Sequence, residues 1–172
     1  MIISIIEGGF RPPSISKKMY KYITKLYALF VFGGILLYFL INSFLDLFFK
    51  GFSDIKINYS IVDIIVVSMI FAPLFETFIF QYLILKLPFH FFKLKKTKSN
   101  ILILCSISSL FFGSQHYQNF GYMIFAFILG VYLSFAFVYV EYQSKYKING
   151  YKLVVAIHFF VNFTAFLLNY IL

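Results

Sequence analysis

The chain has 172 residues, of which 62% are hydrophobic and only 12% charged, and its mean hydropathy is +0.89. So many apolar side chains cannot all be buried in the core of a protein of this length, which excludes a water-soluble domain and indicates an integral membrane protein. The net charge of +9 would suit nucleic acid, but the placement of the basic residues along the chain argues against that class of partner.

Five apolar stretches are predicted as membrane helices, because each approaches the roughly 20 residues that a helix needs to cross the hydrocarbon core. They are residues 26–45, 64–85, 101–117, 120–140 and 153–172, and the third is the shortest. The sequence shows no internal repeat and no separable soluble segment. We therefore predict an all-α fold: a polytopic helical bundle of about five transmembrane helices that forms a single membrane domain over residues 1–172.

A basic lead, residues 1–25, precedes the first stretch and is predicted to lie in the cytoplasm or at the membrane interface. Its opening apolar run is too short for the hydrophobic region of a signal peptide and is followed by Glu7, so we expect the chain to stay whole. The single cysteine, Cys105, excludes an internal disulfide bond, and its place in an apolar stretch favours a small packing residue.

The basic residues alternate with the apolar stretches. Thirteen of the fifteen fall in the basic lead, between the second and third stretches, or between the fourth and fifth; Lys50 and Lys56 are the exceptions. The thirteen are Arg11, Lys17, Lys18, Lys21, Lys25, Lys86, Lys93, Lys95, Lys96, Lys98, Lys145, Lys147 and Lys152. The positive-inside rule then predicts a cytoplasmic N-terminus and, after five crossings, an external C-terminus. We expect a multi-pass protein of a bacterial plasma membrane, with lipid rather than nucleic acid as a partner.

Glu76 is the only charged residue in the stretch 64–85. An ionisable side chain in hydrocarbon is costly unless it is paired or hydrated, so such a residue is by default a candidate functional residue. Pro73 lies about one turn earlier and is expected to free a backbone carbonyl and to kink or open the helix, which would let water or substrate reach the carboxylate. The alternative is a protonated Glu76 that is hydrogen-bonded to a neighbouring helix.

Two further pairs lie in the later apolar stretches at a spacing of four residues, which places both members of a pair on one helix face. The first is Phe112 with His116, and the second is His158 with Asn162. Each has a simpler explanation, since His116 could lie at the interface and His158 with Asn162 could only join helices by hydrogen bonds. Three polar groups on three stretches nevertheless predict one shared site.

These motifs, in this order, resemble the CAAX-protease and bacteriocin-processing (CPBP) family of intramembrane glutamate-type peptidases. That family has a Glu-Glu-x-x-x-Arg motif after an Ala-Pro segment, then Phe-x-x-x-His, then His-x-x-x-Asn. Here Ala72 and Pro73 lead into Glu76, and the two later motifs match the pairs above. The resemblance covers residues 64–168, which would form the peptidase core.

Two positions depart from the family pattern. Thr77 stands where the second glutamate is expected, and Gln81 stands where the arginine is expected. They are four residues apart on one helix, so the chain has exchanged an ion pair for a neutral polar pair rather than leaving one buried charge without its partner. This departure leaves Glu76 in place but puts catalytic competence in question.

The resemblance implies an intramembrane endopeptidase that cleaves a peptide precursor or a membrane-proximal protein tail. It implies that Glu76 activates water with the help of His116, and that His158 and Asn162 hold the developing oxyanion. Thr77, Gln81 and Phe112 would support these residues. No cofactor is expected; zinc bound by the glutamate and the two histidines is the less favoured alternative, because the chain lacks a His-Glu-x-x-His helix.

Two other classes of function stay open. A non-catalytic bacteriocin-immunity or membrane scaffold protein could keep the same fold, and the changes at Thr77 and Gln81 would then reflect relaxed chemistry. A small transporter could use Glu76 as a proton carrier, although this gives no reason for the His-x-x-x-Asn pair. Neither class is excluded by the motifs.

The depths of the three motifs do not agree in a simple arrangement of straight helices. Counted from the nearest lysine on the cytoplasmic side at about 1.5 Å per residue, Glu76 and His158 lie roughly 15 and 9 Å deep, but His116 lies roughly 27 Å deep. We therefore expect the third stretch to begin in the headgroup region.

Overall fold

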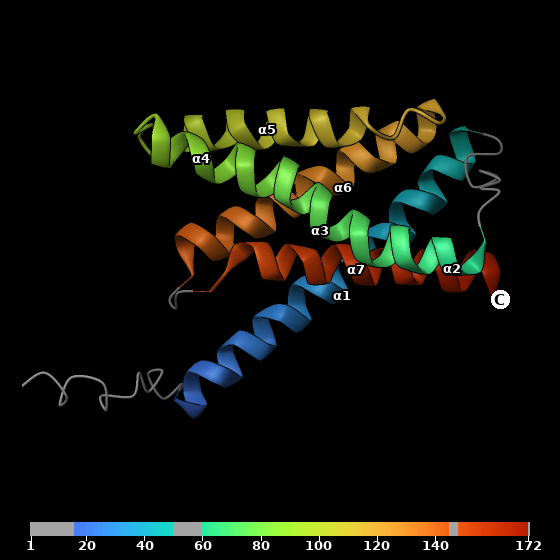
Figure 1. Cartoon of the computed structure of the whole chain (residues 1–172), viewed down its shortest axis with the longest axis horizontal. Coiled ribbons are helices and arrows are strands. Elements are labelled where there is room, and N and C mark those ends of the chain that lie inside the picture. The colour runs from blue at the N-terminus through green and yellow to red at the C-terminus, as the bar shows by residue number, and fades with distance from the viewer. Residues whose placement is uncertain (1–15, 50–59, 145–147, 172) are drawn as a thin grey trace, which may run out of the picture.

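The computed structural model describes residues 16–49, 60–144 and 148–171, and within these ranges every regular element is a helix. The elements are α1 (Lys17–Phe48), α2 (Ile61–Asp63), η2 (Ile64–Phe71), α3 (Ala72–Glu76), η3 (Thr77–Leu83), α4 (Ile84–Phe91), α5 (Lys98–Ser114), α6 (Phe120–Val138), η4 (Tyr139–Gln143) and α7 (Gly150–Tyr170). The symbol η marks a π-helix, and the elements from α2 to α4 follow one another without a break (Figure 1).

Four of the helices in the described part of the chain are long and apolar enough to cross a membrane. They are α1, the continuous helix Ile61–Phe91, the continuous helix Phe120–Gln143, and α7; α5 is a shorter apolar helix. Each of the five predicted stretches overlaps one of these helices. The prediction of an all-α membrane bundle is confirmed, and the protein is a multi-pass membrane protein.

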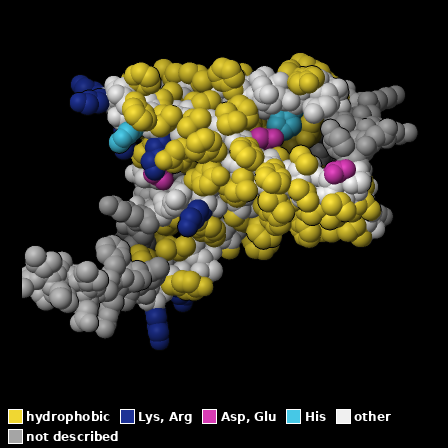
Figure 2. Space-filling view, in the orientation of Figure 1, with side chains coloured by type: hydrophobic (Ala, Val, Ile, Leu, Met, Phe, Trp, Pro, Cys, Tyr) yellow, Lys and Arg dark blue, Asp and Glu magenta, His cyan; other side chains and the backbone are white. Residues whose placement is uncertain are grey.

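The helices alternate in direction, as the placement of the lysines predicts. At the left of Figure 1 lie the start of α1, the connection between α4 and α5, and the start of α7, while the start of α2 and the end of α7 lie at the right. Lysine and arginine side chains visible in Figure 2 lie toward the same left side, away from the largely hydrophobic right side. Five of the basic residues used in the prediction lie outside the described residues: Arg11, Lys50, Lys56, Lys145 and Lys147. Which side faces the cytoplasm therefore stays a prediction.

Short polar side chains cap each helix that begins after a loop, because the first backbone N–H groups of a helix have no partner within it. Each cap accepts a hydrogen bond from the N–H group three residues later. The caps are Ser16, Ser60, Thr97, Asn119 and Asn149. These loop residues fix where the membrane helices start, and the cap at Asn119 also sets the position of the first turn of α6.

The helix Ile61–Phe91 is continuous through Pro73. It contains two π-helical segments, η2 and η3, and Pro73 lies at the start of the short α-helical segment between them. π-turns add a residue to each turn of the helix and occur often at functional sites. The predicted opening of this helix thus takes the form of a wider helix on both sides of α3.

Helix α1 closes one side of the bundle by packing against α6 and α7. The Tyr132 hydroxyl of α6 donates a hydrogen bond to the Phe30 carbonyl of α1 at 2.7 Å. A methyl group placed on Gly34 of α1 would lie 2.8 Å from Ile157 Cγ2 of α7, so the backbone of α1 approaches α7 closely. The three helices therefore form one packed unit.

Helices α5 and α6 are joined by a buried serine pair and by small residues. Ser108 Oγ lies 2.9 Å from Ser134 Oγ and donates to the Phe80 carbonyl at 2.7 Å, so it links three helices. A Cβ atom placed on Gly113 would lie 2.9 Å from Phe127 Cβ and 3.1 Å from Phe127 backbone atoms. Small residues at such contacts let membrane helices approach closely.

The substitution Gly113→Ala is expected to destabilise the protein. Overpacking commonly costs about 1–3 kcal/mol, and the better helix propensity of alanine returns up to about 1 kcal/mol, so a net loss of about 1–2 kcal/mol is expected. Thermal unfolding of the purified protein in detergent measures it. Ser106→Ala, at an exposed position of the same helix, is the control. A Gly113→Ala variant as stable as this control would contradict the close packing.

Candidate functional site

The continuous helix Ile61–Phe91 and helix α7 bring Glu76 and His158 together. Glu76 ends α3, and its Oε2 atom lies 3.6 Å from Nε2 of His158. The His158 side chain is almost fully buried, whereas 27% of the Glu76 side chain is exposed. At 3.6 Å the two atoms are slightly too far apart for a direct hydrogen bond. The carboxylate is thus reachable on one side and faces a buried imidazole on the other.

Phe112 places the second histidine in the same region. Its ring is fully buried and has its centroid 4.9 Å from the His116 ring and 5.5 Å from the His158 ring. His116 follows the end of α5, and its Nδ1 atom lies 2.8 Å from the Phe112 carbonyl oxygen. Because a carbonyl can only accept, Nδ1 carries a proton, and in a neutral imidazole the lone pair is then at Nε2. The Phe-x-x-x-His motif therefore orients His116 through both its ring and its backbone.

The second helix is longer than its apolar stretch, which reduces the disagreement in depth between Glu76 and His116. It continues past Lys86 to Phe91, and counted from Phe91 Glu76 lies roughly 22 Å from the turn, against roughly 27 Å for His116 from Lys98. The hydrogen bond from Ser108 to Phe80 shows that the two helices run side by side. The count does not account for His158, which contacts Glu76 although it lies only about two turns from the start of α7 at Gly150. A start of the third stretch in the headgroup region stays a prediction.

Asn162 contacts the same long helix as His158, but at a different residue. Its Nδ2 atom donates a hydrogen bond to the Ser68 carbonyl in η2 at 2.7 Å. A carboxamide has two N–H donors, so this contact leaves one for another partner. Ser68 was not identified from the sequence, because nothing in the spacing of an isolated serine marks its carbonyl as an acceptor. The face of α7 that carries His158 and Asn162 is therefore the face that packs on the glutamate helix.

Thr77 and Gln81 are completely buried next to Glu76 in η3. Within the described parts of the chain, five buried side-chain atoms have no hydrogen-bond partner: Glu76 Oε2, Thr77 Oγ1, Gln81 Nε2, Gln81 Oε1 and His158 Nδ1. All five belong to residues that the motifs single out. A native protein seldom leaves buried polar atoms unpaired, and each such atom calls for an explanation.

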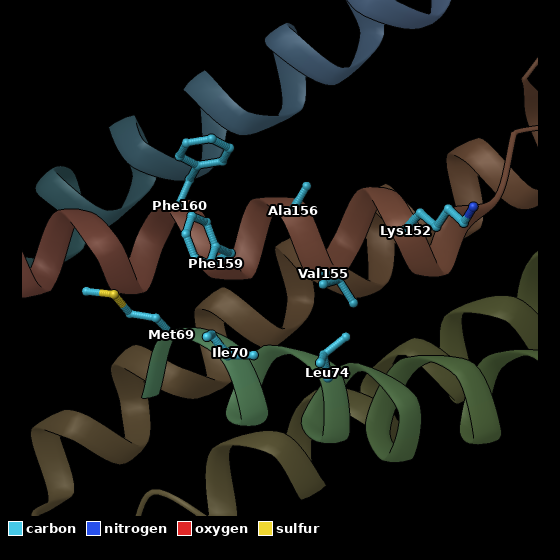
Figure 3. Close-up of a pocket in the computed structure, with 8 residues that line it drawn as sticks. All are labelled: Met69, Ile70, Leu74, Lys152, Val155, Ala156, Phe159 and Phe160. Carbon is cyan, nitrogen blue, oxygen red and sulfur yellow. The ribbon is translucent and has the colours of Figure 1, made fainter. Parts of the chain in front are cut away.

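A shallow groove lies beside this site on the outer surface of the same two helices. It has a volume of about 370 Å³ and is lined by Met69, Ile70, Leu74, Lys152, Val155, Ala156, Phe159 and Phe160. Figure 3 shows its apolar side chains on η2, α3 and α7, with Lys152 at the end away from Met69. None of the candidate site residues lines it. The groove therefore lies outside the candidate site.

No group of three His, Cys, Asp or Glu side chains lies close enough to hold a metal ion in the part of the chain that the structure describes. Glu76 and His158 meet, but His116 is held toward Phe112 and Tyr122. The preference for a metal-independent site stays a prediction.

Comparison with protein families gives a match to the model described as type II CAAX prenyl endopeptidase Rce1-like, over residues 58–164. This range is more than half of the chain and contains all seven candidate site residues, but not α1. Comparisons with curated proteins and with solved structures found no match. The family resemblance inferred from the motifs is confirmed.

Proposed function

The chain belongs to the Rce1-like family of type II CAAX prenyl endopeptidases, and from this membership we propose that it is an active intramembrane endopeptidase. Its reaction would be the hydrolysis of a peptide bond in a peptide precursor or in a protein tail near the membrane. The bacterial plasma membrane is the proposed location.

The observation that carries this proposal is the concentration of unpaired buried polar atoms at the candidate site. Glu76, Thr77, Gln81 and His158 hold all five such atoms among the described residues. Unpaired polar atoms cost stability, so their gathering around one partly exposed carboxylate supports a site arranged for a ligand with many hydrogen-bonding groups. Water and a peptide bond are ligands of this kind.

In the proposed mechanism Glu76 acts as the general base. It takes a proton from a water molecule, whose oxygen attacks the peptide carbonyl, and the proton later passes to the leaving amine. His116 assists through Nε2, the ring atom left free by its hydrogen bond to Phe112. The negative charge that develops on the carbonyl oxygen would be held by His158 and by the second N–H of Asn162. Neutral donors fixed in a water-poor site stabilise such charge well.

Metal independence is part of the proposal and has a direct test. We expect incubation of the purified protein with a strong zinc chelator to leave hydrolysis unchanged, because the proposed base and donors are all side chains of the chain itself. The measurement is the rate with and without chelator, followed by addition of zinc. Loss of activity that zinc restores would overturn this part of the mechanism.

The experiment that tests the function in cells compares the membrane peptides of cells that express the wild-type protein with those of cells that express Glu76→Gln. We expect one or more precursors or uncleaved tails to accumulate in the variant cells. Glu141→Gln is a suitable control, because Glu141 pairs with Lys86 at 2.6 Å and with the Gly150 N–H group, away from the site. Identical peptides in all three kinds of cell would favour the non-catalytic scaffold or immunity function. The changes at Thr77 and Gln81 are the sequence features that agree with this alternative.

A further inference from the structure

Tyr122 is a residue of the site that the motifs do not contain. It lies in the first turn of α6, where its backbone N–H donates to the Asn119 side chain at 2.7 Å. This cap holds the first turn of the helix directly after the short loop that carries His116. The position of the tyrosine is therefore set by the same connection that sets the position of the histidine.

The ring of Tyr122 completes the enclosure of His116. The two ring centroids lie 5.1 Å apart at an interplanar angle of 71°, an edge-to-face contact. Phe112 contacts the same imidazole at 4.9 Å and also accepts its Nδ1 hydrogen bond through the backbone. Two aromatic rings and one hydrogen bond leave the imidazole little freedom to rotate, so the direction of its Nε2 atom is fixed.

A chain of aromatic contacts holds the Tyr122 ring in this place. The ring stacks on Phe125 at an interplanar angle of 7°, and Phe125 meets Tyr38 of α1 edge-to-face at 5.7 Å. The ring of Tyr122 is therefore supported from the side of α1 while it contacts His116.

We propose that Tyr122 is a positioning residue of the peptidase site. Its ring keeps His116 in the orientation in which Nε2 faces the reacting water. This inference rests on the proposed peptidase function and changes no covalent step.

The activity test removes the ring of Tyr122 and then restores it without the hydroxyl. Tyr122→Leu loses the ring contact with His116, and Tyr122→Phe keeps it, while Tyr132→Phe changes a tyrosine of the same helix that donates to Phe30, away from the site. The substrate is a quenched fluorescent peptide that ends in a prenylated CAAX sequence, cleaved by the purified full chain in nanodiscs. We expect Tyr122→Leu to lower kcat by about 10- to 100-fold with little change in KM, Tyr122→Phe to recover most of the loss, and Tyr132→Phe to match the wild type.

A spectroscopic test does not depend on activity. The chain has three histidines, His90, His116 and His158, so NMR of isotope-labelled histidine gives few signals to assign. We expect Tyr122→Leu to shift the ring nitrogen signals of His116, because the ring contact is lost, while the signals of His90 and His158 report that the fold is kept.

The outcomes separate this inference from the proposed function. If Glu76→Gln is inactive but Tyr122→Leu keeps the wild-type kcat, or if Tyr122→Leu leaves the His116 signals unchanged, the positioning role is wrong and the peptidase function stands. If Glu76→Gln cleaves the peptide as fast as the wild type, the peptidase function itself is wrong.

Discussion

Glu76→Gln is expected to abolish hydrolysis while leaving the protein as stable as the wild type or more stable. Glutamine keeps the size of the side chain but cannot take a proton from water, and loss of a general base commonly costs about 100- to 10,000-fold in rate. The same change removes a carboxylate whose Oε2 atom is buried without a hydrogen-bond partner among the described residues, so it relieves a cost of folding.

The measurements are the rate of cleavage of a prenylated CAAX peptide and the thermal unfolding midpoint, both on purified protein. Glu141→Gln should give the opposite pattern, with activity kept and some stability lost, since Glu141 bonds to Lys86 and Gly150. A Glu76→Gln variant that is inactive only because it is unfolded would not support the role of Glu76. A stable variant with full activity would rule that role out.

The substitutions Thr77→Glu and Gln81→Arg together restore the family pattern. We expect their effects on the free energy of unfolding to be strongly non-additive. Each position is completely buried. A single charge placed there has no partner and should lower the free energy of unfolding by about 3–5 kcal/mol. The double variant places opposite charges four residues apart on one helix, where they pair, so we expect it to recover about 2–3 kcal/mol relative to the sum of the single changes.

Unfolding of the four proteins in mixed detergent micelles completes this double-mutant cycle. Thr77→Gln is the control for size, because it enlarges the side chain without adding a charge. Strictly additive effects would mean that the two side chains do not share one buried site. If the double variant also cleaves faster than the wild type, the neutral pair in this chain is a weakened form of the charged one.

Most of the fold follows from composition, because apolar stretches of sufficient length become helices in a membrane. The ends of the helices were less accessible to prediction. Lys86 was taken as the end of the second helix, but the helix continues to Phe91. A lysine within a membrane helix is compatible with this, because its long side chain can lie along the helix and reach the interface. The π-helical segments around Pro73 also escaped prediction, because a proline in a sequence indicates a disturbed helix without specifying its form.

For the site, spacing predicted which residues share a face but not what each side chain contacts. The meeting of Glu76 with His158 was expected from two motifs on two helices. The contact of Asn162 with the Ser68 carbonyl depends on how η2 displaces the backbone, and the contact of Tyr122 with His116 depends on a loop between α5 and α6. Tertiary placement of this kind is not recorded in the spacing of a motif.

The packing of α1 against α6 and α7 bears on the order in which the protein is made. Helix α1 leaves the ribosome before α6 and α7, on which it packs, so it enters the bilayer before these partners are present. Its long apolar sequence permits this, because such a helix is stable in lipid before it finds its partners. Helix α7 carries His158 and Asn162. When it inserts, it provides both the packing surface for α1 and the contacts with the helix of Glu76. A chain interrupted before residue 150 would have neither.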